Sequence, residues 1–254
     1  MEIKNIKIGN GQPKICLPLT GTTKEQLIEQ AKRTQTTTAD IIEWRVDKYY
    51  REDREIEDIL ATLEDLSTYL NGKLLLFTFR SIEEGGEKEI SLSAYHDLCL
   101  AGAKNPSVDL IDIELAKTEF LGRTFIQQLK AENVKIIMSS HDFEKTPKDG
   151  ELIYQIGVMN QMGADIGKIA AMPQNLQDVL RMMNIISRAK AFNKLPIAAI
   201  SMGELGKISR IAGEITGSVL TFGTLEEIEN SAPGQISIEE LQFTMEILHL
   251  SDRG

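Results

Sequence analysis

A lysine lies within a short apolar segment, "IGKIAAMP", at residues 166–173. Removing a charged ammonium from water costs several kcal/mol unless a partner compensates or the proton is lost. As a free amine, a lysine can attack a ketone and form an imine, and burial together with nearby cations favours this uncharged form. We therefore expect Lys168 to act as a nucleophile rather than as a packing residue.

A histidine, His141, ends another apolar segment, "KIIMSSH" at 135–141. Histidine changes its protonation state near neutral pH, so it can remove a proton from the carbon beside an imine and return it to a leaving hydroxyl. A protonated imine draws the released electrons toward its nitrogen. Lys168 and His141 together therefore indicate carbonyl chemistry. A structural role fits them less well, because an amine and a neutral base add little to a network of ion pairs.

Further polar residues alternate along the apolar segments. Parallel strands that are buried on both faces are usually almost entirely apolar. With a two-residue period, Glu43, Arg45 and Asp47 share one face of their segment. The same alternation occurs at Thr78 and Arg80, at Asp112 and Glu114, and at Ser139 and His141. Most of these residues lie near the carboxyl end of a segment, where barrel enzymes assemble their active sites.

Two of these acidic residues admit a second interpretation. The interiors of barrels sometimes contain ion pairs whose role is structural. Asp112 and Glu114 could neutralise arginines such as Arg45 without taking part in chemistry. The sequence leaves their role open.

Eight apolar segments alternate with amphipathic ones. The apolar segments predict strands that start near residues 14, 41, 74, 110, 135, 166, 196 and 218. Amphipathic patterns predict helices that include 23–33, 55–70, 175–190 and 237–250. The last of these begins with Ser237 and Glu240 at the spacing of a capping box. This alternation is typical of repeated βα units.

Eight such units predict an α/β fold, a single (β/α)8 TIM barrel that forms one catalytic domain over residues 1–254. The segment "IKNIKIG" at 3–9 is left over at the front, and we expect a short strand or hairpin there that closes the bottom of the barrel. A doubly wound open sheet is the alternative. We find no linker, low-complexity tract or repeat that would divide the chain.

The composition predicts a cytoplasmic globular protein. The 254 residues are 42% hydrophobic and 26% charged, and the first ones carry charges where a signal peptide would be apolar. No stretch approaches the roughly 20 apolar residues of a membrane helix. A net charge of -10 without a basic block argues against nucleic acid as a partner. Cys16 and Cys99 lack the spacing of a metal or redox site, so we interpret them as reduced core residues.

Motifs of several other chemistries are missing from the sequence. It contains no H-E-x-x-H, G-x-S-x-G or G-x-G-x-x-G pattern. The fragment "GELGK" at 203–207 ends like a phosphate loop, but Ser201 stands where the first glycine is required. We therefore expect no metal site and no cofactor.

A series of motifs resembles the type I 3-dehydroquinate dehydratases in order and spacing. The motifs are "EWRVD" at 43–47, "FTFRS" at 77–81, "EGGE" at 84–87, "SHDF" at 140–143, "KIAAMPQ" at 168–174, "ISRIAGE" at 208–214 and "SAPGQI" at 231–236. The similarity extends from "KICLPL" to "ILHL". No single motif identifies the family. The resemblance rests on seven motifs that occur in the same order along the chain.

The resemblance implies a cofactor-free lyase of the shikimate pathway, which serves aromatic amino acid biosynthesis. Such an enzyme dehydrates 3-dehydroquinate to 3-dehydroshikimate through an imine, or Schiff base, on a lysine. By motif match Lys168 is that lysine, and His141 is the general acid/base that takes the C2 proton and helps water to leave. Glu84 of the "EGGE" motif orients the histidine. The resemblance also implies a homodimer.

Other matched positions imply contacts with the substrate, a polyhydroxylated ring that bears a carboxylate. Arg210 matches the residue that clamps the carboxylate. The residues implied to hold the ring hydroxyls and close over the ring are Glu43, Arg45, Arg80, Ser231 and Gln235. Trp44 lies inside a matched motif and counts as a binding residue. Strand alternation points its side chain away from Glu43, so we expect packing or a backbone contact from it.

The sequence departs from the family pattern in two places that bear on the site. Pro18 stands where some relatives have a serine that touches the substrate, and proline offers no side-chain hydrogen bond. The segment "TLEEIEN" before "SAPGQ" is longer and more acidic than expected. The roles of Ser231 and Gln235 therefore depend on the geometry of this loop.

Two other classes of function remain as alternatives. A class I aldolase on the same kind of barrel would use the same imine to cleave a carbon–carbon bond. Sugar-phosphate aldolases usually need a phosphate site near strands seven and eight, and we see no glycine-rich loop for one there. A non-catalytic binding protein could keep the barrel, but the combination of Lys168, His141 and Glu84 argues against it.

Overall fold

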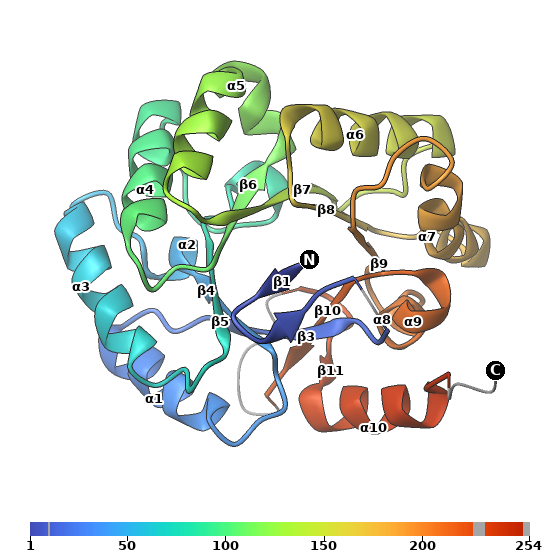
Figure 1. Cartoon of the computed structure of the whole chain (residues 1–254), viewed down its shortest axis with the longest axis horizontal. Helices are drawn as coiled ribbons and strands as arrows, with labels where there is room; N and C mark the ends of the chain where they lie inside the picture. Colours follow the sequence, from blue (N-terminus) through green and yellow to red (C-terminus); the bar gives the residue numbers. More distant parts are fainter. Residues whose placement is uncertain (10, 226–231, 251–254) are drawn as a thin grey trace.

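The central element is a parallel sheet that curls into a barrel (Figure 1). The computed structural model describes residues 1–9, 11–225 and 232–250. In sequence order the barrel strands are β3 Lys14–Leu19, β4 Ile41–Arg45, β5 Leu74–Thr78, β6 Leu110–Glu114, β7 Lys135–Asp142, β8 Ile166–Ala171, β9 Ile197–Ser201 and β10 Leu220–Thr224. Each starts within two residues of its predicted position, which confirms the strand prediction.

The sheet closes where its first and last barrel strands meet. Strand β10 pairs with β3 in parallel, and the remaining strands follow in chain order to β9. The backbone N–H of Val219, next to β10, donates to the carbonyl of Ile197 in β9 at 2.9 Å. The (β/α)8 barrel is therefore confirmed, and the open-sheet alternative is wrong.

Helices cover the outside of the barrel (Figure 1). The longer ones are α1 Lys24–Thr34, α3 Ile56–Ser67, α4 Leu92–Lys104, α5 Leu115–Ala131, α6 Asp149–Met162, α7 Leu176–Ala189 and α10 Ile238–Leu248. The short ones are α2 Val46–Tyr49, the 3-10 turn η1 Ile82–Glu84, α8 Lys207–Ile211 and α9 Gly213–Thr216. The predicted capping box is present, because Ser237 and Glu240 exchange hydrogen bonds at the start of α10.

A small hairpin covers the amino end of the barrel. Strands β1 Glu2–Ile3 and β2 Ile6–Lys7 are antiparallel, and Ile8 after them is only 1% exposed. Ile8 belongs to an apolar cluster with residues at the amino ends of the strands, among them Ile41 and Leu110. Lys4 donates to Asp109, just before β6, at 2.7 Å. The prediction that a hairpin closes the bottom is therefore confirmed.

The two-residue period of the strands separates the barrel interior from the layer beneath the helices. In β4, the indole of Trp44 is buried in the outer layer, where its ring centroid lies 5.9 Å from that of Phe77. Glu43 and Arg45 point to the other side, into the barrel mouth. The alternation stops two residues earlier than expected, because β4 ends at Arg45 and Asp47 lies in α2.

The chain returns to the barrel mouth after β10. Strand β11, Ile236–Ser237, pairs in parallel with β10 and fixes the position of the preceding residue, Gln235. Cys16 and Cys99 are buried free thiols, as expected. Within the described ranges, none of the helices is long and apolar enough to cross a membrane.

Candidate active site

A pocket opens at the carboxyl end of the barrel, where barrel enzymes assemble their active sites. Its polar lining consists of Glu43, Arg45, Arg80, Glu84, His141, Lys168, Arg210 and Gln235. These side chains come from segments far apart in the sequence, and the parallel strands bring their carboxyl ends to one rim. The structure thus brings together most of the residues that the sequence singled out.

Lys168 lies at the base of this pocket. Lys168 is 5% exposed, and its Nζ lies 4.2 Å from the centroid of the Phe222 ring. The Oδ2 atom of Asp112 lies 3.6 Å from the same nitrogen. A carboxylate and the face of an aromatic ring both stabilise a positive charge. The lysine therefore has a buried counter-charge in Asp112, a pairing that the sequence analysis did not predict.

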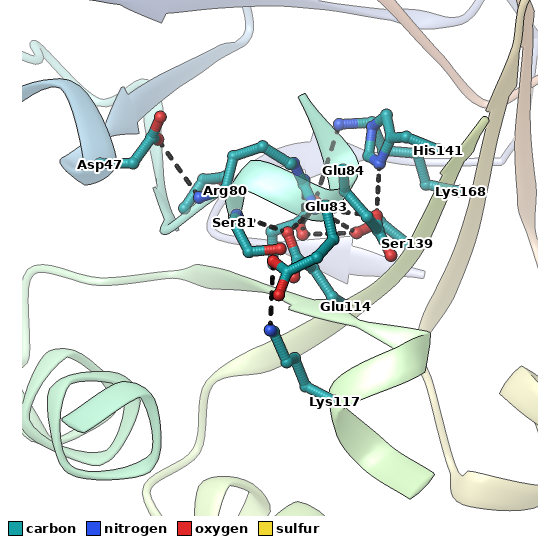
Figure 2. Close-up of polar contacts among 12 residues, drawn as sticks. Asp47, Arg80, Ser81, Glu83, Glu84, Glu114, Lys117, Ser139, His141 and Lys168 are labelled. Carbon is teal, nitrogen blue, oxygen red and sulfur yellow. Dashed lines mark hydrogen bonds and ion pairs between the residues drawn. The ribbon is translucent and has the colours of Figure 1, made fainter. Parts of the chain in front are cut away.

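His141 lies in β7, which pairs with β8, the strand that contains Lys168. A carboxylate contacts its ring (Figure 2). Its Nδ1 is 2.8 Å from Oε2 of Glu84. Burial and the nearby arginine and lysine cations lower the pKa of His141 well below its ordinary range. Burial raises the pKa of Glu84 to about 8, with help from other buried carboxylates and against the effect of Arg80. When Glu84 is ionised it accepts from Nδ1–H, so Nε2 carries the lone pair that a base needs.

The pH dependence of kcat/KM tests how Glu84 affects the protonation of His141. In the wild type, one proton is shared by His141 and Glu84, and the imidazole is a base only after that proton is lost. In Glu84→Gln, His141 must hold the proton alone, and its lowered pKa makes it a poor acceptor. We expect the acid limb of kcat/KM to move to lower pH by about 1 unit or more in this variant. A limb that stays in place or moves to higher pH would contradict the pairing.

The glycine after Glu84 fixes the turn that holds the carboxylate. Turn η1 ends at Glu84 and is followed by Gly85, which has a φ of 85°. A Cβ at this position would lie 2.3 Å from the ring of Phe143. Only glycine combines this left-handed backbone with so close an approach. The "EGGE" motif therefore lets Phe143 pack on the turn and line the pocket beside His141.

Arg80 is the centre of a buried network of acidic groups (Figure 2). Its guanidinium donates to Asp112 at 2.7 Å and to Glu114 at 3.0 Å. It also donates to Ser139 at 3.0 Å. Burial opposes the charge, but the surrounding carboxylates outweigh it and raise the pKa of Arg80 well above its ordinary range. The structural interpretation of Asp112 and Glu114 is thus correct in part, because both neutralise Arg80.

The β4 residues at the rim are held by neighbours in a similar way. Arg45 donates through Nε and Nη2 to the two carboxylate oxygens of Asp47, each at 2.8 Å. Such a two-point contact fixes the plane of the guanidinium. Glu43 accepts from the hydroxyl of Thr78 at 2.9 Å. Both rim side chains therefore keep one orientation toward the pocket.

Arg210 has a different environment from the other arginines. It is 2% exposed, and it donates to the backbone carbonyls of Pro233 at 2.9 Å and Phe222 at 3.4 Å. Its Nε is buried without a hydrogen-bond acceptor, and no carboxylate of the described residues lies within ion-pair distance. Burial lowers the pKa of Arg210 to about 10. A buried cation without a counter-ion is a site for an anionic ligand.

One of the expected binding residues, Trp44, does not contribute its side chain to the pocket. The indole of Trp44 packs behind the sheet against Phe77 and Tyr49, away from the pocket. Ser231 lies outside the described residues. Gln235 does line the pocket.

The sequence reasoning missed the apolar part of the lining. This part consists of Phe143, Ala170, Ile200, Met202, Phe222 and Ala232. Strand period provides a signal for one of them, because Ala170 shares a face with Lys168. Phe143 and Met202 follow their strands, where the period no longer applies. Among the residues described, no group of acidic, histidine or cysteine side chains is arranged to hold a metal ion.

Comparison with known proteins identifies the class of enzyme that this barrel and pocket form. Residues 15–252 match the type I 3-dehydroquinase family. The chain is 43% identical to a 3-dehydroquinate dehydratase of Clostridioides difficile over 99% of this chain and 98% of that protein. It is 44% identical to one from Clostridium botulinum, with 98% and 97% covered.

Solved structures agree with these sequence matches. The type I 3-dehydroquinate dehydratase of Clostridium difficile, with covalent modified comenic acid, has a TM-score of 0.93 and 42% identity, with 98% of this chain and 97% of that chain covered. The 3-dehydroquinate dehydratase of Enterococcus faecalis has a TM-score of 0.90 and 35% identity, with 98% and 100% covered.

The fold and its pocket are those of a barrel lyase. The chain belongs to the type I 3-dehydroquinase family and is a 3-dehydroquinate dehydratase of aromatic biosynthesis. The resemblance drawn from the motifs is thereby confirmed. The aldolase and the non-catalytic binding protein lose their support.

Proposed function

We propose that this enzyme dehydrates 3-dehydroquinate through an imine on Lys168, with His141 as the general acid/base. One observation carries the proposal. A buried lysine and a histidine that is paired with a carboxylate line the same pocket from neighbouring strands. This combination provides a nucleophile for the ketone and a base for the adjacent carbon.

The proposed reaction starts at the ketone of the substrate. Nζ of Lys168 attacks C3, the C3–O bond breaks, and the oxygen leaves as water. Nε2 of His141 then takes a proton from C2 while the electrons of the C–H bond move toward the imine nitrogen. The same proton goes to the hydroxyl on C1, and the C1–O bond breaks as water leaves. Water finally hydrolyses the imine, which releases 3-dehydroshikimate and the free lysine.

A relative supports a covalent step in this fold. The dehydratase of Clostridium difficile, which shares 42% of its residues with this chain, was solved with covalent modified comenic acid. In the present structure, Lys168 is buried against the ring of Phe222, and Phe143 lines the same pocket. Such a wall keeps bulk water from an imine that it would hydrolyse early.

The remaining polar groups of the pocket suit the rest of the substrate. Arg210 is proposed to bind the carboxylate, because it is the buried arginine that has no carboxylate partner among the described residues. The ring hydroxyls are proposed to contact Glu43, Arg45, Arg80 and Gln235, which line the pocket, and Ser231 of the "SAPGQI" motif. Trp44 is proposed to support Glu43 and Arg45 from behind the strand.

The carboxylate site leads to a binding prediction. Arg210→Met keeps most of the packing but removes the charge, so we expect KM for 3-dehydroquinate to rise by about 10- to 100-fold, the loss of a charge-assisted contact. The midpoint of thermal unfolding of the empty enzyme should not fall, because the variant no longer buries an uncompensated cation. Steady-state kinetics and calorimetry measure both quantities.

A control variant and a contrary result complete this test. Arg51→Met removes an exposed arginine that pairs with the exposed Asp53 and does not line the pocket, so the KM of this variant should stay at the wild-type value. An unchanged KM in Arg210→Met would show that the carboxylate binds elsewhere. A large loss of stability with an unchanged KM would give Arg210 a structural role instead.

Oxygen exchange tests the imine without any mutation. The ketone oxygen of the substrate leaves as water when the imine forms, and the ketone oxygen of the product comes from the water that hydrolyses the imine. In water enriched with oxygen-18, the product should carry the label at C3 after one turnover. A rapid quench limits exchange in solution, and substrate without enzyme gives the background. Unlabelled product would refute an imine and favour direct elimination from an enolate.

Two expectations from the sequence stay predictions. They are the homodimer and the cytoplasmic location. Both come from the family resemblance and the composition.

A further inference from the structure

Asp112 presents one fixed and one open carboxylate oxygen. The residue is fully buried in β6 below the pocket. Its Oδ1 accepts from Nη2 of Arg80 at 2.7 Å and from Oγ of Ser139 at 2.6 Å. Its Oδ2 has no hydrogen-bond donor among the residues that the structure describes, and it lies 3.6 Å from Nζ of Lys168. A buried carboxylate oxygen without a donor is costly, so its position calls for an explanation.

The two donors on Oδ1 determine where Oδ2 points. Arg80 and Ser139 hold the carboxylate from two directions, so it cannot turn away from Lys168 without losing both contacts. Burial alone would raise the pKa of Asp112, but the cations and the hydroxyl around it hold that pKa below its ordinary range. Asp112 therefore keeps a negative charge aimed at the lysine nitrogen.

We propose that Asp112 is the counter-ion of the protonated imine nitrogen of Lys168. This inference rests on the proposed imine mechanism. When a lysine ammonium condenses with a ketone, a C–N bond forms, the ketone C–O bond breaks, and two of the three N–H protons leave with the oxygen as water. The nitrogen keeps one proton and its positive charge. A carboxylate fixed at this distance therefore stabilises the nitrogen before and after condensation.

The charge on the nitrogen matters because only a protonated imine is a strong electron sink. Without a counter-ion, the arginines around the pocket would favour loss of that proton. Other titratable groups that interact electrostatically with Lys168 include Cys16 of β3, Glu84 of η1 and His141 of β7. Within the described part of the chain, Asp112 is the residue in ion-pair contact with Nζ of Lys168. It acts on elimination by holding the proton in place.

Asp112→Asn tests the proposal, because asparagine keeps the shape but removes the charge. We expect borohydride to trap the imine at Lys168 still, while the alkaline limb of kcat moves to lower pH by about 1 unit or more. Glu114→Gln is the matched control. Glu114 also pairs with Arg80, at 3.0 Å, but it is not in ion-pair contact with Lys168. Its alkaline limb should stay at the wild-type pH.

The results separate this inference from a structural role and from failure of the mechanism. Equal shifts in both variants, or no shift in Asp112→Asn, would overturn the proposal and leave Asp112 as a support for Arg80. Failure to trap an imine at Lys168 in the wild type would instead overturn the proposed function.

A measurement on the wild type covers the case in which Asp112→Asn does not fold. With lysine labelled by nitrogen-15 at Nζ and 3-dehydroshikimate added, the NMR shift of the imine nitrogen reports its protonation. We expect it to stay protonated well above neutral pH. An imine nitrogen that loses its proton near neutral pH would show that no effective counter-ion faces it.

Discussion

Lys168→Ala is expected to abolish dehydration of 3-dehydroquinate, with a loss in kcat on the order of 10⁵-fold. The effect is large because the amine supplies both the covalent bond and the electron sink. No other lysine lines the described pocket, so none can replace it. The product is a conjugated enone, and the rise in its ultraviolet absorbance measures the rate.

The variant is expected to fold. The substitution removes the ion pair between Asp112 and Lys168. Arg80 still donates to Oδ1 of Asp112 at 2.7 Å, so the buried carboxylate remains paired with a cation. Circular dichroism checks the fold. Lys145→Ala is a suitable control, because Lys145 lies in a separate groove at the same end of the barrel and should be replaceable without loss of rate. A Lys168→Ala protein that retains substantial turnover would rule out an imine on this residue.

His141→Ala is expected to form the imine but to lose elimination by about 10²- to 10⁴-fold, the range of general acid–base catalysis. Lys168 keeps its position, since its contacts to Asp112 and Phe222 do not involve the imidazole. The covalent imine complex should therefore accumulate in His141→Ala, whereas in the wild type it is converted to product. Intact-protein mass spectrometry after mixing with substrate measures its amount.

The outcome distinguishes a base from a residue that only shapes the pocket. His96→Ala serves as the control, because His96 lies on α4 and bonds to Asp97. We expect wild-type turnover and no accumulation from it. If His141→Ala turned over at nearly the wild-type rate, another group would have to remove the C2 proton. If it formed no imine, His141 would be needed for condensation as well.

The sequence predicted the barrel well because each strand is a distinct apolar run between amphipathic helices. The segment at Leu74–Thr78 contains four consecutive large apolar residues, and the structure starts β5 at its first residue. The front hairpin was predictable only as a leftover segment. Its contact with Asp109 depends on where β6 begins in space, which no local pattern encodes.

Period-two reasoning located the catalytic candidates but could not determine their partners. It placed Lys168 and His141 on the inner face of adjacent strands, where the structure has them. It did not reveal that Asp112 pairs with Lys168 across the barrel, because that contact joins β6 and β8, which are not neighbours. Pairing across a closed barrel depends on its tilt and closure, which follow from all the strands together.

The pattern also failed where the chain leaves the regular strand. Asp47 was expected on the face shared by Glu43 and Arg45, but β4 ends at Arg45 and a helical turn follows. From that turn Asp47 holds the guanidinium of Arg45 and accepts from the backbone N–H of Arg80 at 3.2 Å. Phe143 was missed for the same reason, because it lies just beyond β7.

Reductive trapping with peptide mapping tests the central claim most directly. Enzyme, 3-dehydroquinate and sodium borohydride are mixed, the protein is digested, and the modified residue is located by mass spectrometry. We predict one modified peptide, the one that contains Lys168, carrying the mass of a reduced substrate or product adduct, and no such peptide without substrate. Modification of a different lysine, or none while the enzyme turns over, would contradict the account.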